Sequence, residues 1–214
     1  MRTFIALALP NPIKRSVAEW QRRLLLQLQT QGLADSVRWT PQENLHLTLR
    51  FLGDTTPVQR TQLEQSLAAL AADQPGIGLA LHALGCFPNF RRPNIVWLDF
   101  SGDVAVLEEI HRQTEHAAQQ AGFLAEERPF APHLTIGRVA KNAAQSDLQR
   151  TGAVLRQCAL DADSPKPDAS PFVTDRIVFM QSELRPTGAV YSVLSAYNFG
   201  TPGQAAGAAA GQAR

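Results

Sequence analysis

The sequence predicts an α+β fold, with mostly antiparallel strands and helices packed on their outer side. Stretches of alternating polar and apolar residues, typical of strands, are separated by stretches with helical periodicity. Several successive strands are joined too briefly for the crossovers that parallel pairing needs. The segment His46-Leu47-Thr48-Leu49 returns as His133-Leu134-Thr135-Ile136. We therefore expect a duplicated unit with one such strand in each half.

In the first half of the chain, prolines and glycines separate segments whose own periodicity is clear. The elements expected here are strand 2–9, helix 13–31, strands 37–40 and 44–53, and a helix that begins near Pro57. Pro10 ends the first strand, and Gly32 is placed to cap the first helix. The inner stripe of the second helix is expected to comprise Val58, Leu63, Leu67 and Leu70.

The second half repeats this arrangement. The elements expected here are strands 77–87 and 94–100, helix 103–121, the strand that carries His133, helix 142–158, and strands 172–180 and 189–199. The inner stripe of the third helix is expected to comprise Val106, Leu107, Ile110 and Thr114. Residues 161–171 have the composition of a loop. The connection 88–93 is too long for a two-residue turn, and whether its Phe90, Arg91 and Arg92 contact a ligand stays open.

The composition is that of an ordinary globular protein. With 214 residues, 44% of them hydrophobic, the chain can fill a substantial core as one large domain or two small lobes. The formal net charge is +1, from 20 Lys and Arg against 19 Asp and Glu. A protein that coats nucleic acid through a broad basic surface is not expected, whereas recognition of one phosphate or one RNA end stays open.

Neither the cysteines nor the hydropathy indicate an exported or membrane protein. Cys86 and Cys158 stand in no CxxC spacing, so we expect buried thiols, and not a disulfide framework or a metal site. The apolar run at residues 2–9 begins almost at once and stops at Pro10, unlike a signal peptide. No run approaches the roughly 20 apolar residues of a membrane span. We expect a cytoplasmic protein with no membrane partner.

The repeated histidine segments are the main indication of function. A single His in an amphipathic strand is more often a hydrogen-bonded structural residue than a catalyst. Alternation, however, places His46 with Thr48, and His133 with Thr135, on the face of each strand opposite the apolar residues. Because the same triplet recurs at two of five histidines, we favour a functional pair. The remaining histidines are expected to be structural or solvated: His82, His111 and His116.

Two such strands side by side would hold two imidazoles and two hydroxyls around one small anion. No HExxH motif, carboxylate cluster or Cys–His grouping offers a metal three or four ligands, and no GxSxG or Walker-type loop is present. A neutral His can take a proton from water while a protonated His gives one to the leaving oxygen, which suits phosphodiester cleavage. The threonine hydroxyls would donate hydrogen bonds to the phosphorane oxygens.

Two arginines are candidates to bind the phosphate. By alternation, Arg50 is in phase with His46 and Thr48. Arg138 is out of phase with Thr135 and reaches the same side only if a bulge near Gly137, or the end of the strand, re-aims it. Alternation alone therefore favours Arg50, although a solvated arginine at a strand end is an equal alternative.

These motifs resemble the 2H phosphoesterase superfamily, and within it the RNA 2′,3′-cyclic phosphodiesterases, also known as 2′-5′ RNA ligase-like proteins. The similarity lies in residues 2–7, 44–53, 87–98 and 132–138. It implies a bilobed fold in which two mostly antiparallel sheets face a central groove with the helices outside. A single domain over residues 1–200 and a disordered Ala/Gly-rich tail at 201–214 are expected.

The resemblance also implies a site and an activity. His46 is the expected proton donor and His133 the proton acceptor, and Thr48, Thr135 and Arg138 are expected to bind the phosphate, so Arg138 ranks above Arg50. The implied reaction is hydrolysis of RNA 2′,3′-cyclic phosphate ends to 2′-phosphates without a metal or other cofactor, with weak reversible 2′-5′ ligation as a side reaction. The expected partners are RNA with a cyclic phosphate end or a small cyclic nucleotide.

Some alternatives stay open at this point. A non-catalytic nucleotide-binding module on the same fold is the main alternative to an enzyme. We expect a monomer. Trp39 and Phe130, which flank the two motifs, suit either the core or base stacking.

Overall fold

The structure is a computed structural model that describes residues 1–140, 143–160, 169–185 and 188–200. The expected disordered tail and most of the expected loop at 161–171 lie outside these residues. The helices are α1 (Asn11–Thr30), α2 (Pro57–Asp73), α3 (Val104–Gln120) and α4 (Gln145–Leu160), with single 3₁₀ turns at Ala34–Ser36 and Gln42–Asn44. The strands are β1 (Arg2–Ala8), β2 (Val37–Trp39), β3 (His46–Asp54), β4 (Ile77–Phe87), β5 (Ile95–Gly102), β6 (Leu134–Val139), β7 (Phe172–Thr174), β8 (Arg176–Arg185) and β9 (Gly188–Asn198).

The strands form one curved antiparallel sheet, which confirms the predicted α+β class. Its order is β7-β4-β5-β6-β3-β1-β8-β9, and β2 pairs with β6 beside this path. We expected two sheets. The halves are instead continuous, because β3 and β6 pair through Leu47 and Leu134 before they diverge. Both leucines are fully buried, so the junction between the halves is part of the core.

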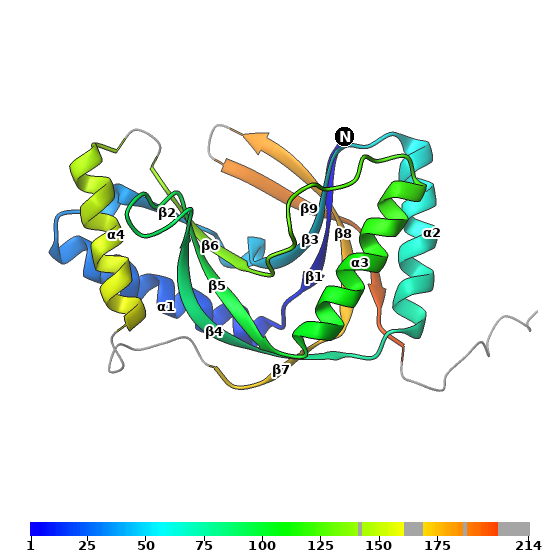
Figure 1. Cartoon of the computed structure of the whole chain (residues 1–214), viewed down its shortest axis with the longest axis horizontal. Helices are drawn as coiled ribbons and strands as arrows, with labels where there is room; N and C mark the ends of the chain where they lie inside the picture. The colour runs from blue at the N-terminus through cyan, green and yellow to red at the C-terminus, as the bar shows by residue number, and fades with distance from the viewer. Residues whose placement is uncertain (141–142, 161–168, 186–187, 201–214) are drawn as a thin grey trace, which may run out of the picture.

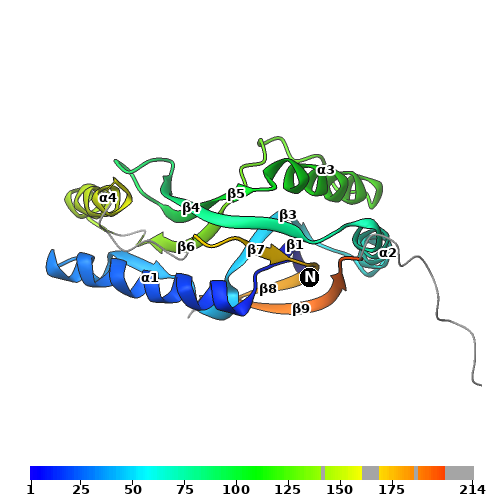
Figure 2. The ribbon, with the colours of Figure 1, turned by 90° about the horizontal axis from the view of Figure 1, so that it is seen from below.

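The helices lie on the outer side of the sheet in two pairs. Helix α1 packs with α4 over one half, and α2 packs with α3 over the other half (Figures 1 and 2). Among the helices that the structure describes, none combines the length and the apolar character needed to cross a bilayer.

Two residues of the expected inner stripes are exposed. Val58 is 69% exposed and Val106 is 38% exposed. Successive residues of a helix are rotated by about 100°, which puts Val58 on the side of α2 opposite Leu63 and Leu67, and Val106 at the edge of the stripe of α3. These two expectations were wrong because the stripe was assigned from loose spacing, and the remaining stripe residues are buried or pack against the core.

The two faces of the sheet have different environments. The main core lies between the sheet and the helices, and Trp39 and Phe130 pack against it. A small cluster on the other face consists only of strand residues: Phe4, Ala6, Val178 and Met180, with Ala8 and Tyr191 packed beside them. We call this second side the helix-free face. The free cysteines, Cys86 and Cys158, are buried as expected, and burial raises the pKa of Cys86 to about 12.

Candidate active site

The two predicted histidines lie where the halves of the sheet meet. His46 is the first residue of β3, and His133 directly precedes β6. Leu47 pairs with Leu134, and the two strands run antiparallel. One residue to either side of this pair, Thr135 therefore lies across from His46 and Thr48 lies across from His133. One His and one Thr from each half therefore flank a local twofold axis.

Both imidazoles are anchored in the same way. His46 Nδ1 lies 2.7 Å from the carbonyl oxygen of Asn44, and His133 Nδ1 lies 2.7 Å from the carbonyl oxygen of Ala131. A carbonyl only accepts hydrogen bonds, so each Nδ1 carries a proton. Nε2 is then the ring nitrogen that gains or loses a proton in each histidine. This is the arrangement that acid or base catalysis by histidine requires.

His46 is enclosed by aromatic rings on the helix-free face. Its ring centroid lies 4.8 Å from that of Phe4 and 5.3 Å from that of Tyr191. Burial, together with the positive charges of Lys14 and His133, lowers the pKa of His46 to about 4. The ligand-free protein therefore holds His46 neutral at pH 7, and a bound anion would raise its pKa.

His133 has its own aromatic neighbours. The edges of its ring face Phe87 at 5.1 Å and Trp97 at 6.4 Å, measured between centroids. Burial lowers the pKa of His133, and the positive charge of Arg138 lowers it further.

The two threonines offer hydroxyl groups beside the imidazoles. Thr48 and Thr135 are both half-buried. Within the part of the chain that the structure describes, neither hydroxyl has a protein hydrogen-bond partner, so both are available to a ligand. The structure thus brings together the four His and Thr residues predicted from the repeated triplets.

A β-bulge turns Arg138 toward this group. Trp97 of β5 pairs with Thr135, whereas Val96 pairs with Gly137, so Ile136 is the extra residue on β6. Gly137 and Val139 are then buried while Arg138 is exposed. A bulge near Gly137, one of the two conditions under which Arg138 could reach this side, is therefore present, and it places Arg138 on the same face as Thr135.

A buried glutamine supports the bulge. Gln21 of α1 is 6% exposed, and its Nε2 donates to the carbonyl oxygens of Ile136, at 2.7 Å, and Thr40, at 2.9 Å. Gly137 allows β2 to lie close, since a Cβ there would be 2.7 Å from Val37 Cγ1. Sequence patterns gave no signal for Gln21, because it falls on the apolar face of a helix among ordinary core positions.

A second bulge removes Arg50 from the site. Ile5 of β1 pairs with Arg50 and Ala6 pairs with Thr48, so Leu49 is the extra residue on β3. The prediction that Arg50 is in phase with His46 and Thr48 was therefore wrong. Arg50 is 8% exposed and lies under α3, where its Nε is 2.5 Å from Glu115 Oε2. It also contacts Glu126 and the carbonyl oxygen of Leu124.

The same bulge brings Phe51 to the helix-free face. Phe51 is 54% exposed, and its ring centroid is 5.7 Å from that of Phe4. It stands five residues after His46, as Arg138 stands five residues after His133. Alignment of the two repeats would have indicated this equivalence, which was missed because the triplets alone were compared.

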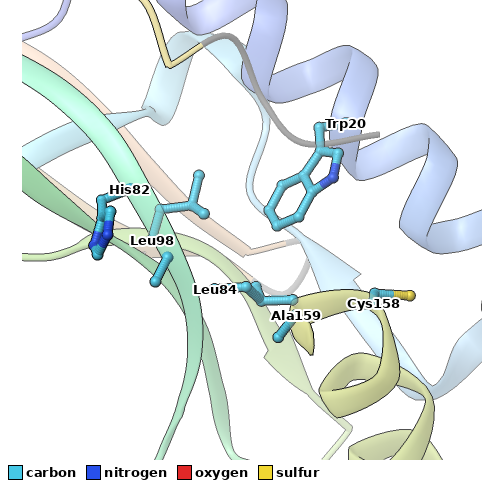
Figure 3. Close-up of a pocket in the computed structure, with 7 residues that line it drawn as sticks. Trp20, His82, Leu84, Leu98, Cys158 and Ala159 are labelled. Carbon is cyan, nitrogen blue, oxygen red and sulfur yellow. The ribbon is translucent and has the colours of Figure 1, made fainter. Parts of the chain in front are cut away.

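The remaining histidines are not part of this group. His82 is 66% exposed and lies near Asp99, and it lines a separate cavity of about 150 Å³ together with Trp20, Leu84 and Cys158 (Figure 3). In that cavity the sulfur of Cys158 points away from His82 (Figure 3), so the two do not form a nucleophile and base pair. His111 stacks on Phe130, with 3.9 Å between ring centroids.

A family model of LigT-like phosphoesterases matches residues 7–97. A protein of Escherichia coli strain K12 named RNA 2′,3′-cyclic phosphodiesterase is 31% identical over 142 residues, which are 66% of this chain and 74% of that protein. A Thermotoga maritima protein of the same name is 28% identical over 197 residues, 91% of this chain and 93% of that protein. A Geobacillus stearothermophilus protein of that name is 34% identical over 135 residues, 63% of this chain, and the match spans 41% of its own length.

Solved structures share the fold. A Thermus thermophilus protein superposes with a TM-score of 0.72 at 20% identity, over 93% of this chain and 98% of that chain. E. coli LigT in complex with 3′-AMP superposes with a TM-score of 0.68 at 22% identity, over 92% of this chain and 97% of that chain. The curved sheet with two outer helix pairs is thus an architecture that these proteins have in common.

Proposed function

This chain belongs to the LigT-like phosphoesterases, and we propose that it hydrolyses RNA 2′,3′-cyclic phosphate ends to 2′-phosphates. The observation that supports this most is the symmetric pair of histidines, each held through Nδ1 by the carbonyl two residues earlier. The curated relatives carry the name RNA 2′,3′-cyclic phosphodiesterase. Among the described residues, no group of three or more His, Cys, Asp and Glu could hold a metal.

In the proposed reaction, His133 takes a proton from water through Nε2 as the water oxygen attacks phosphorus. The bond from phosphorus to O3′ breaks, and His46 gives its Nε2 proton to O3′, which leaves the phosphate on O2′. Thr48 and Thr135 donate hydrogen bonds to the two non-bridging oxygens, and the guanidinium of Arg138 balances their growing negative charge.

The acid role of His46 depends on the bound substrate. Its pKa of about 4 in the ligand-free protein disfavours the protonated form at pH 7. The anionic cyclic phosphate raises that pKa when it binds, so His46 acquires its proton together with the substrate. The pKa of His133, lowered by burial and also by Arg138, favours the neutral form of this residue and suits it to the role of base.

The same groups can run a ligation. If the 5′-hydroxyl of a second RNA replaces water as nucleophile, O3′ leaves as before and a 2′-5′ linkage forms, as a weak and reversible side reaction. One chain carries both histidines, so the protein is proposed to act as a monomer. The proposed location, the cytoplasm, rests on the sequence alone. The alternative function is a nucleotide-binding module that releases its ligand unchanged; the two intact His and Thr pairs favour the enzyme.

The test uses adenosine 2′,3′-cyclic phosphate and RNA with a cyclic phosphate end, incubated with the protein in excess chelator. We expect adenosine 2′-phosphate, separated from the 3′-isomer by chromatography. His46→Ala and His133→Ala are each expected to lower kcat by about 10²-fold or more, whereas the exposed His82→Ala is the matched control. Loss of activity in chelator, or full activity of His46→Ala, contradicts the proposal, and tight binding without turnover favours the binding module.

A further inference from the structure

Two arginines lie directly opposite each other on neighbouring strands beside the site. Arg38 of β2 pairs with Arg138 of β6 in the antiparallel ladder. Both are exposed, while the flanking pair Val37 and Val139 is buried in the main core, so both guanidinium groups lie on the helix-free face. Opposed residues of such a pair have Cβ atoms about 5 Å apart, and like charges there are destabilising.

Nothing in the described part of the chain neutralises this pair. No carboxylate of the described residues forms an ion pair with Arg38 or with Arg138, although other arginines, such as Arg50 and Arg60, have acidic partners. A ligand anion between the two guanidinium groups would remove the repulsion and form charge-assisted hydrogen bonds with both. The pair is therefore suited to an anion that extends beyond the reacting phosphate.

The connection between β4 and β5 brings a further arginine close to the end of β6. Ile95 of β5 pairs with Arg138, and the Asn94 carbonyl accepts a hydrogen bond of 2.9 Å from the Val139 amide. Arg92 precedes Asn94 by two residues and lines a cavity of about 550 Å³ that Val139 also lines. Arg92 thus lies near Val139, the residue that follows Arg138 in β6.

The connection is shaped by local hydrogen bonds and by a close contact with α4. The side-chain oxygen of Asn89 accepts from the amides of Arg91, at 2.9 Å, and Arg92, at 3.1 Å. Gly152 of α4 lies so close that a Cβ there would be 1.7 Å from the carbonyl oxygen of Phe90. In both views of the fold this connection lies beside α4 (Figures 1 and 2).

A second cavity opens between the connection and α4. Its volume is about 600 Å³, and its described lining includes Arg91 and Arg156, the amide side chains of Asn89 and Gln149, the ring of Phe90, and no acidic group. Neither arginine forms an ion pair with a described carboxylate. The formal net charge of the whole protein is only +1, so this run of arginines is a local concentration and not part of a generally basic surface.

We propose that the RNA strand on the 5′ side of the cyclic phosphate crosses the β4–β5 connection, where Arg38 and Arg92, and then Arg91 and Arg156, bind its phosphodiesters. This inference rests on the proposed function and names its substrate class as an oligonucleotide end. Contacts to phosphate position a strand without reading its bases, so the selectivity concerns strand length. We expect a cyclic mononucleotide held between the histidines not to contact Arg91 and Arg156.

The test measures kcat/KM for two substrates. One is a short oligoribonucleotide that ends in a 2′,3′-cyclic phosphate, and the other is adenosine 2′,3′-cyclic phosphate. In the double variant R91Q/R156Q, the ratio of these two values is expected to fall about tenfold or more. For the oligonucleotide, log kcat/KM should fall as log salt concentration rises. In R91Q/R156Q the slope of this plot is expected to be less steep by about 1.4, because two phosphate contacts to a single strand are lost. The double variant R22Q/R23Q, on exposed positions of α1, removes the same charge and should leave the ratio unchanged.

An unchanged ratio in R91Q/R156Q, or an equal fall in R22Q/R23Q, overturns the inference while hydrolysis itself stands. If the protein hydrolyses neither substrate, the proposed function fails, and binding decides the inference separately. A fluorescein-labelled RNA with a 3′-phosphate should then bind about tenfold more tightly to the unsubstituted protein than to R91Q/R156Q by anisotropy. Equal affinity overturns the inference.

Discussion

Phe51 and Arg138 occupy equivalent positions in the two halves of the protein. Each stands five residues after its histidine (51 − 46 and 138 − 133), and each follows a β-bulge in its strand. One half therefore presents an aromatic ring on the helix-free face where the other presents a guanidinium. If Arg138 binds the reacting phosphate as proposed, we expect the nucleoside to lie on the side of Phe51.

Phe51→Ala is expected to weaken nucleotide binding. Stacking of a base on an aromatic side chain contributes about 1–3 kcal/mol, so KM for adenosine 2′,3′-cyclic phosphate should rise about tenfold while kcat changes less. Because Phe51 is 54% exposed, the melting temperature should stay near that of the unsubstituted protein. An unchanged KM would show that the nucleoside lies elsewhere.

Arg138→Gln and Arg50→Gln are expected to have opposite signatures. Loss of one charged donor to the reacting phosphate should lower kcat/KM about 10²-fold with little change in thermal stability, since Arg138 is exposed. Arg50→Gln instead leaves Glu115 without its buried partner, which costs about 3–5 kcal/mol of unfolding free energy, while the folded fraction keeps its kcat. Measured kcat/KM and urea unfolding of both variants check this, and the reverse pattern would contradict the effect of the bulges.

Gln21→Met should reduce activity from a position that cannot touch the substrate. The variant removes two donors to the carbonyl oxygens of Ile136 and Thr40, and we expect a loss of about 1–3 kcal/mol of stability. A looser bulge misplaces Arg138, so kcat should fall several-fold more than the folded fraction explains. Gln29→Met, on the exposed side of α1, is the control, and full activity of Gln21→Met would exclude a positioning role.

Acid should destabilise the protein through His46. Its pKa is about 4 in the folded state and about 6.5 in the unfolded chain, so the unfolded state binds more protons between these values. The free energy of unfolding should therefore fall as the pH falls from about 6.5 to 4, by up to about 3 kcal/mol from this residue. His46→Asn should remove much of that slope in urea titrations, whereas the exposed His82→Asn should retain it.

Much of the fold and the site was predictable because it is encoded locally. Periodicity located the helices and most strands, since one buried face per element leaves a pattern of 3.6 or 2 residues. The recurrence of one triplet identified His46 and His133 with their threonines. The assignment of the arginines was not predictable from alternation, because a single extra residue reverses the face of every residue that follows it.

The sequence by itself thus determined the α+β class, the two His-Leu-Thr triplets and the apolar positions that hold them in strands. Tertiary structure alone decided that Leu47 and Leu134 join the halves into one sheet, that Arg50 turns under α3, and that Arg138 turns toward His133. The physical reason is that these outcomes depend on bulges and on pairing across the sheet. Both are set by contacts between residues far apart in the chain, such as Gln21 with Ile136.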